Sequence, residues 1–422
     1  MQKINLEGLN EYVAYEKLDN NLDVYVYRKK DFHSFYAYYI TNYGALNTEF
    51  VPINEEKMHK FPDGIAHFLE HKMFEKEDGH VLEKFPLIGG SSNAFTSYTH
   101  TVYQVSGTEK FYDNLNLLIN FVENPYFTDK NVEKEKGIIK QELFMGKDNP
   151  YRVFAFEKLK NLFVNLGYGR EIVGEEKDID SITKEDLYKC YNTFYNPANM
   201  AMVICGDFEP EKLLEEIKKR LIEKKANGEI KRIYPEEPES IVKEKTEQKM
   251  DVSEPLFTIG IKDKVATPKE KVKKHLAIEI LLNMLIGKSS KLYQELYNKG
   301  MLFVTPGVDY EFSRDYAHIL ITGQSKYPEQ VYDLFKNAVN ELKENGIDLE
   351  EFERVKKMLY GSFIKEYDEP GDIARMFIAD FFKGINSFEY LEEIATINEQ
   401  YVEQMLKEVF VDNKMVLSVI KK

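Results

Sequence analysis

The 422-residue sequence contains no tryptophan and only two cysteines, Cys190 and Cys205, which are too few for a disulfide framework or a thiolate metal site. It has no run of 18 apolar residues, so we expect no membrane-spanning helix and no membrane partner. The opening residues, MQKINLEGLNEYV, lack the apolar core of a signal peptide, and we therefore expect a cytoplasmic protein.

Basic residues are also in deficit. The 57 Lys and Arg residues stand against 72 Asp and Glu residues, which gives a formal net charge of −15. Binding to phosphate backbones needs an excess of Lys and Arg, so we expect no nucleic-acid partner. The composition, with 43% hydrophobic and 31% charged residues, is typical of a globular protein. The chain is long enough for two or three domains.

The chain contains an internal repeat, because four segments recur in the same order about 216 residues later. Residues 115–122 carry apolar side chains at i, i+3, i+4 and i+7, as an amphipathic helix does, and residues 331–338 repeat this pattern. The recurring segments are a strand (101–107 and 318–323), a helix (115–122 and 331–338), a second helix (127–145 and 347–363) and a second strand (199–205 and 414–420).

The repeat predicts two homologous domains, residues 1–223 and 255–422. Between them, residues 224–254 are rich in charge, contain Pro235 and Pro238, and have no sustained apolar period. These features indicate a linker. We expect an α+β fold in which each domain is a two-layer α/β unit, with a mainly antiparallel sheet flanked by helices.

The segment GIAHFLEHKMF holds His67, Glu70 and His71 in a His-x-x-Glu-His pattern. On a helix the two histidines lie one turn apart on the same face, so both imidazoles can reach one tetrahedral metal ion. Glu70 would lie beside the metal, placed to accept a proton from water rather than to act as a ligand. Six further positions are apolar, so the helix is expected to be buried; the alternative is two core histidines and a glutamate with satisfied hydrogen bonds. These positions are Ile65, Ala66, Phe68, Leu69, Met73 and Phe74.

A second predicted helix, 127–145, carries two acidic residues on its apolar face. Glu135 and Glu142 lie seven positions apart and so almost above one another. Two buried carboxylates require a cation or strong donors, and a metal ion held by two histidines usually takes a carboxylate as its third protein ligand. The alternative is a pair of glutamates that contacts a Lys or Arg across the core. The expected apolar stripe consists of Val132, Ile138, Ile139, Leu143 and Met145.

The second copy of the repeat has lost this polar set. At an offset of 212, the positions of His67, Glu70 and His71 are occupied by Glu279, Leu282 and Asn283, and at an offset of 220 Glu142 corresponds to Ser362. A requirement of function in one copy, rather than of folding in both, explains this asymmetry best.

On these motifs the chain resembles the zinc peptidases of the pitrilysin, insulin-degrading enzyme and mitochondrial processing peptidase family, the inverzincins. The resemblance covers essentially the whole chain and includes GGSSNAFTSYTHTVY and FYNPANMAMVICGDF. It implies Zn²⁺ as cofactor, with His67, His71 and Glu142 as ligands, Glu70 as general base and Glu135 as a supporting catalytic residue. It also implies that the two domains form half of a clamshell, as in the short bacterial members.

The resemblance further implies a groove for peptide substrates. In the family, the segment that corresponds to residues 91–97 is an edge strand on which the substrate lies as an added strand. Asn93, Ala94 and Phe95 would then bind the substrate; the alternative is a plain strand without a ligand role. The implied function is that of a zinc-dependent metalloendopeptidase that cleaves peptides in an enclosed chamber; a non-catalytic structural or targeting subunit is the alternative.

One family feature is missing. Complete relatives carry an Arg and a Tyr in the second copy that hold the substrate carbonyl, within a stretch that here reads LYNKGMLFV. Tyr297 occupies the Arg position and Phe303 the Tyr position, and Phe303 has no hydrogen-bond donor. Either Arg314 or Tyr316 compensates, or a paralogous chain supplies the Arg and Tyr. We expect the second arrangement, a heterodimer in which this chain is the zinc subunit; alone it can form a homodimer that is nearly inactive.

Overall fold

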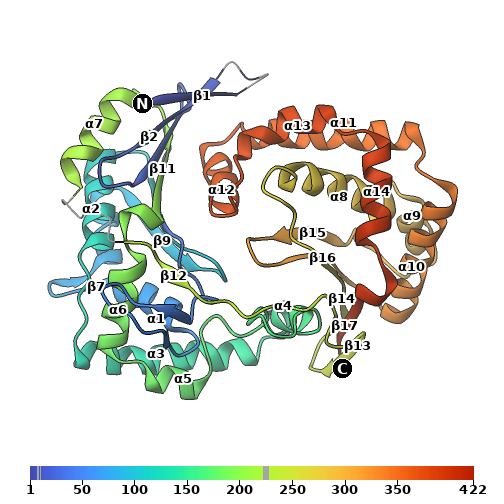
Figure 1. The fold of residues 1–422 in the computed structure, drawn as a ribbon, viewed down its shortest axis with the longest axis horizontal. Coiled ribbons are helices and arrows are strands. Elements are labelled where there is room, and N and C mark those ends of the chain that lie inside the picture. Colours follow the sequence, from blue (N-terminus) through green and yellow to red (C-terminus); the bar gives the residue numbers. More distant parts are fainter. Residues whose placement is uncertain (7–8, 10, 222–227) are drawn as a thin grey trace. The chain divides into compact units, whose positions relative to one another are not determined.

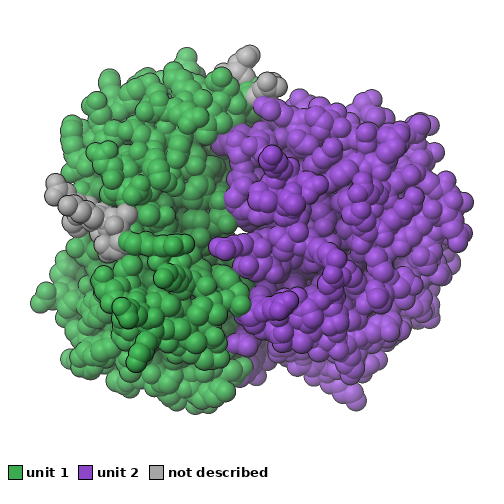
Figure 2. Space-filling view, in the orientation of Figure 1, with its two compact units in different colours: residues 1–145, 171–234, 366–382 green, residues 146–170, 235–365, 383–422 purple. Residues whose placement is uncertain are grey.

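The computed structural model describes residues 1–6, 9, 11–221 and 228–422 (Figure 1). This part of the chain divides into two compact units, which Figure 2 colours separately. Unit 1 comprises residues 1–145, 171–234 and 366–382; unit 2 comprises residues 146–170, 235–365 and 383–422.

Unit 1 is built on a seven-stranded open sheet in the order β1-β2-β3-β11-β4-β10-β9. All neighbouring strands are antiparallel except β3 and β11, which run parallel. The strands are β1 Gln2–Leu6, β2 Glu11–Lys17, β3 Asp23–Arg28, β4 Phe35–Thr41, β9 Gly90–Thr96, β10 Thr101–Gly107 and β11 Met200–Gly206. Small sheets are formed by β5 Glu49–Val51, β6 His59–Lys60 and β12 Lys231–Arg232, and by β7 Glu75–Lys76 and β8 Gly79–His80.

Helices cover both faces of this sheet. Alternate residues of β4 point to opposite faces, so Ala37 and Tyr39 join the core that includes α1 and α2, whereas Tyr36 points away from that core and meets Gly371 of α12. Phe377 of α12 packs on Tyr25 of β3, with ring centroids 4.4 Å apart. The helices of unit 1 are α1 Ile65–Met73, α2 Phe111–Glu123, α3 Asp129–Lys147, α5 Glu176–Ser181, α6 Lys184–Phe194, α7 Pro210–Arg220 and α12 Pro370–Phe381.

Unit 2 repeats the central part of this topology. Its sheet has the order β13-β17-β14-β16-β15, which matches β3-β11-β4-β10-β9 of unit 1, down to one parallel pair, β13 with β17. Its strands are β13 Lys245–Lys249, β14 Leu256–Asp263, β15 Gly307–Phe312, β16 Ala317–Gln324 and β17 Met415–Lys421. Its helices are α4 Pro150–Lys160, α8 Lys271–Ile286, α9 Lys291–Asn298, α10 Pro328–Asn345, α11 Leu349–Glu366, α13 Tyr390–Thr396 and α14 Glu399–Val409.

Each compact unit contains one helix that comes from the other copy of the sequence repeat. Helix α4 comes from the N-terminal copy of the repeat but packs on β14 and β17, where Phe154 contacts Leu256 and Ile420. Helix α12 comes from the C-terminal copy but packs on β4 and β11. The compact units therefore differ from the sequence ranges 1–223 and 255–422, because each sheet has one face covered by a helix from the other copy.

The predicted fold class is confirmed: both sheets are open, mainly antiparallel and flanked by helices. The four repeated segments form matching elements, β10 with β16, α2 with α10, α3 with α11 and β11 with β17. In the predicted linker, residues 224–227 lie outside the described residues; the described remainder contributes β12 to unit 1 and β13 to unit 2. No helix among the described residues has the length and apolar character needed to span a membrane.

The predicted apolar stripe of α3 was wrong at two positions. Val132, Ile139 and Leu143 are buried, but Ile138 is 44% and Met145 is 74% exposed. The three buried residues lie within a narrow arc of the helix, and Ile138 and Met145 lie well outside it at 100° per residue.

Candidate metal centre

Helix α1 carries the His-x-x-Glu-His motif and is held at its start by two glycines. Gly64 precedes the helix with φ +85°, and a Cβ on it would lie 2.3 Å from the carbonyl oxygen of Val173. A Cβ on Gly174 would lie 2.4 Å from the carbonyl oxygen of Asp63. The two loops can therefore touch only because neither glycine carries a side chain. The helix then packs against α6, β9 and β10, which buries His67 and Glu70.

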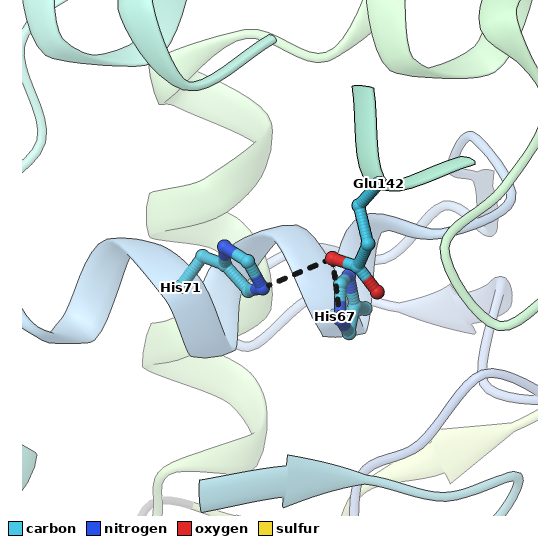
Figure 3. Close-up of side chains that lie close together, drawn as sticks. All are labelled: His67, His71 and Glu142. Carbon is cyan, nitrogen blue, oxygen red and sulfur yellow. Dashed lines mark ion pairs between the residues drawn. The ribbon is translucent and has the colours of Figure 1, made fainter. Parts of the chain in front are cut away.

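Three side chains from two helices converge here. His67 and His71 leave one face of α1, and Glu142 reaches them from α3, as Figure 3 shows. Glu142 Oε2 lies 3.8 Å from His67 Nε2 and 3.6 Å from His71 Nε2. Among the described residues, this is the cluster of three His, Cys, Asp or Glu side chains whose ligand atoms all lie within 4.8 Å of one another.

This donor set fits a zinc ion. Ligand atoms about 2.0–2.1 Å from a tetrahedral metal lie roughly 3.4 Å from one another, close to the separations between Glu142 and the two histidines. Two imidazole nitrogens and one carboxylate oxygen leave the fourth position open, which is the pattern of catalytic rather than structural zinc sites.

The second acidic residue of α3 supports one of the histidines. Glu135 Oε1 lies 3.1 Å from His71 Nδ1, so the ring donates its Nδ1 proton to the carboxylate and presents the Nε2 lone pair to the site. The other oxygen of Glu135 lies 3.5 Å from Lys72 Nζ. The sequence left two alternatives for these glutamates, a metal ligand or a contact with a Lys or Arg. Glu142 faces the histidines, as the first predicts, and Glu135 contacts a buried lysine, as the second predicts.

Glu70 lies beside the cluster and is held by the neighbouring sheet. Thr96 Oγ1 donates a hydrogen bond of 2.8 Å to Glu70 Oε2, and both side chains are buried. Burial raises the pKa of Glu70 to about 6, although the hydrogen bond from Thr96 and the charge of His71 act in the opposite direction. A carboxylate with a raised pKa is a better proton acceptor than an exposed one.

The electrostatic field of the site favours a cation. Burial lowers the pKa of His71, but the hydrogen bond with Glu135 and the charges of Glu70, Glu135 and Glu142 outweigh burial and raise it above its ordinary value. Burial raises the pKa of Glu135, yet its hydrogen bond to His71 and the charges of Lys72 and His71 bring it below the usual range. The carboxylates that favour a proton at His71 also favour a metal ion.

The strand predicted to bind substrate is the edge of the large sheet. Strand β9 pairs with β10 on one side, with Asn93 opposite Gln104 and Phe95 opposite Val102, and no described strand pairs with its other side. Asn93 and Phe95 are exposed and Ala94 is half-buried. The strand also packs against α1, and its last residue, Thr96, contacts Glu70 beside the metal cluster.

Unit 2 has no corresponding cluster among its described residues. Tyr297 and Phe303 are 50% and 64% exposed, so neither is part of the hydrophobic core. Tyr316, one of the two predicted substitutes for the missing donors, is buried against Tyr168 with ring centroids 4.1 Å apart. Tyr316 is therefore enclosed within unit 2, whereas Arg314 is exposed.

Sequence reasoning missed two residues of this region, Lys72 and Thr96. The sequence does give a signal for Lys72, because it is the charged residue that interrupts the apolar positions after His71. Thr96 gives no such signal, since its role depends on β9 lying beside α1.

Two histidines from a His-x-x-Glu-His helix and a glutamate from a later helix define a site of the inverzincin class. Residues 57–175 match the family described as Insulinase (Peptidase family M16), and residues 181–359 match the family described as Peptidase M16 inactive domain. The chain is 37% identical over 427 residues to the Bacillus subtilis protein named uncharacterized zinc protease YmfH, and the match covers 100% of both chains. This chain belongs to peptidase family M16.

Solved structures agree with this assignment. An M16-like peptidase from Alicyclobacillus acidocaldarius is 30% identical, with a TM-score of 0.94 over 99% of this chain and 100% of that chain. A protease from Helicobacter pylori shares the fold at a TM-score of 0.82 and 20% identity, over 98% and 100% of the two chains. In sequence alone, a shorter match is 28% identical over 37% of this chain and 30% of its relative, an Arabidopsis thaliana protein named probable mitochondrial-processing peptidase subunit beta.

Proposed function

We propose that the chain is a zinc-dependent endopeptidase that cleaves peptides bound along β9. One observation carries this proposal: Glu70, next to the His67–His71–Glu142 cluster, is hydrogen-bonded to Thr96, the last residue of the free edge strand. A proton acceptor, a metal-ligand set and a peptide-binding edge are thereby joined in one place.

The proposed metal would be held by His67 Nε2, His71 Nε2 and one oxygen of Glu142. Zinc held there would supply Lewis-acid chemistry, which lowers the pKa of water and polarises a carbonyl group. Glu70 accepts the proton of the attacking water and passes it to the leaving amine. Thr96 keeps the Glu70 carboxylate oriented, and Glu135 keeps the His71 ring oriented.

The substrate would bind as an extended strand beside β9. Its amide and carbonyl groups would pair with the free edge of Asn93, Ala94 and Phe95, which recognises extended shape more than side-chain identity. The packing of β9 against α1 then brings the peptide backbone towards the metal cluster.

We further propose that a paralogous chain completes the site as the second subunit of a heterodimer. Phe303 has no donor for the substrate carbonyl, and the hydroxyl of Tyr316 is enclosed within unit 2. The similarity to a protein named as a subunit of a processing peptidase supports a two-chain arrangement. The chamber in which peptides are cleaved would be closed by the partner.

The test is cleavage of a peptide mixture by the zinc-loaded chain, alone and with paralogous chains, with cut sites read by mass spectrometry. We expect one zinc ion per chain and cleavage when a paralogue is present. A chain that retains zinc but cleaves nothing in any combination would instead be a structural or targeting subunit, and a chain that binds no zinc would contradict the proposed metal centre.

A further inference from the structure

Lys72, the residue after His71 on α1, is completely buried, with 0% of its surface exposed. A buried ammonium group is costly unless it is paired, and Lys72 has two carboxylate partners. Its Nζ pairs with Glu75 Oε2, on β7, and lies 3.5 Å from Glu135 Oε2, on α3. This lysine therefore connects the metal helix to the helix that supplies Glu142.

The carboxylate of Glu135 is held at both of its oxygens. Oε1 faces His71 Nδ1 at 3.1 Å, and Oε2 faces Lys72 Nζ at 3.5 Å. A carboxylate fixed by two different partners cannot turn towards the Nε2 side of the His71 ring without losing one of them. Glu142 is then the remaining carboxylate of α3 that faces the two histidine Nε2 atoms.

We propose that Lys72 is a positioning residue of the metal centre. Its ammonium holds Glu135 on the Nδ1 side of His71, which sets the ring with Nε2 towards the metal position and reserves the third ligand place for Glu142. This inference rests on the proposed zinc site, and it assigns to Lys72 a role in metal affinity beyond the stability of the core.

The purely structural alternative is that Lys72 serves Glu75, with which it makes its shorter ion pair. Removing the carboxylate of Glu75 leaves the contacts from Lys72 to Glu135 and from Glu135 to His71 intact. Removing the ammonium group of Lys72 breaks the first of these contacts. Glu75→Gln is therefore the matched control for Lys72→Met, a change that keeps the length of the side chain and loses its charge.

The experiment measures the zinc dissociation constant by competition with a chelator, and the His71 tautomer in the metal-free protein at pH 8 by ¹⁵N NMR of the ring. Lys72→Met should weaken zinc binding by about 10–100-fold, the usual effect of losing support for a ligand, and should reduce the population of the Nδ1–H tautomer. Glu75→Gln should change neither quantity. Equal effects of the two substitutions, or no effect of Lys72→Met, would overturn the proposal.

A coupled measurement isolates the route through Glu135. In a Glu135→Gln background, Lys72→Met should cause no further loss of zinc affinity, because the group through which it acts is already uncharged; an undiminished loss there would refute the route. If Lys72→Met does not fold, Lys72→Gln provides the same comparison with a polar side chain. Absence of zinc binding by the unaltered chain would refute the zinc site itself, whereas the tautomer of the metal-free protein still reports on Lys72.

Discussion

Glu70 and Glu142 lie close to the same two histidines but have different surroundings. Glu70 is buried and accepts a hydrogen bond from Thr96, whereas Glu142 is partly exposed and faces both Nε2 atoms. The first arrangement suits a proton acceptor, and the second suits a ligand.

Glu70→Gln should therefore retain zinc and lose hydrolysis. The amide keeps the size of the side chain but cannot accept the proton, so kcat should fall by about 10²–10⁴-fold with about one zinc ion still bound per chain. Glu77→Gln, at an exposed position in the adjacent hairpin, is the control and should leave both quantities unchanged. Wild-type turnover by a zinc-loaded Glu70→Gln protein would show that another group is the base.

The two glutamates of α3 should respond differently to truncation. Glu142→Ala removes a proposed ligand and should leave the purified protein largely free of zinc, while Glu135→Ala removes a supporting group and should weaken zinc binding by about 10–100-fold. Metal analysis after dialysis, with circular dichroism to confirm folding, measures both. The reverse order of effects would make Glu135 the ligand.

At the scale of elements, the free edge of β9 predicts a periodic response to backbone methylation of the substrate. Successive amides of an extended peptide point in opposite directions, so only every second one can pair with β9. Methylating a paired amide should lower kcat/KM by roughly 5–10-fold, the effect of losing about 1 kcal/mol, and methylating its neighbours should do little. A series of singly methylated peptides tests this, and a flat response would exclude strand addition.

Helix α8 is the counterpart of α1 and still contains a partly buried carboxyl group, that of Glu279. Burial, aided by the charge of Asp309, raises the pKa of Glu279 to about 7. Between pH 4.5 and 7 the folded state binds more protons than the unfolded state, so this group's contribution to stability is present below pH 4.5 and is lost as the pH rises through 7.

Glu279→Gln should therefore raise the free energy of unfolding at pH 8, on the order of 1–3 kcal/mol, and change it little at pH 4.5. Urea unfolding at the two pH values measures the difference. The exposed Glu344→Gln on α10 is the control and should show no pH-dependent gain. Equal effects at both pH values would mean that Glu279 does not titrate between them in the folded state.

For the whole molecule, the missing donors predict that activity depends on a second chain. Each donor to a developing oxyanion is worth about 10²–10³-fold in rate, so the chain alone should be nearly inactive and should gain at least that factor when a paralogue with the Arg and Tyr is added. Steady-state cleavage of one fluorogenic peptide at increasing paralogue concentration measures this. Full activity of the single chain, unchanged by the paralogue, would refute the heterodimer.

The cytoplasmic location also stays a prediction.

The sequence by itself determined which candidate side chains share one helical face, and it determined the repeated topology. Both depend on local spacing: i and i+4 place His67 and His71 on one helical face, a separation of seven aligns Glu135 with Glu142, and the alternation of strands and helices recurs in the second copy. Patterns of this kind survive folding, because the backbone geometry that produces them is the same in every helix and strand.

Only the tertiary structure decided which partners these side chains meet. Lys72 contacts Glu135, 63 positions later, and Thr96 contacts Glu70 from a neighbouring strand. The exposure of Met145, and the exchange of α4 and α12 between the two units, also follow from how elements pack. Helical periodicity gives the direction of a side chain around its own axis, but the surface that covers this direction comes from residues distant in the chain, and so no local pattern contains it.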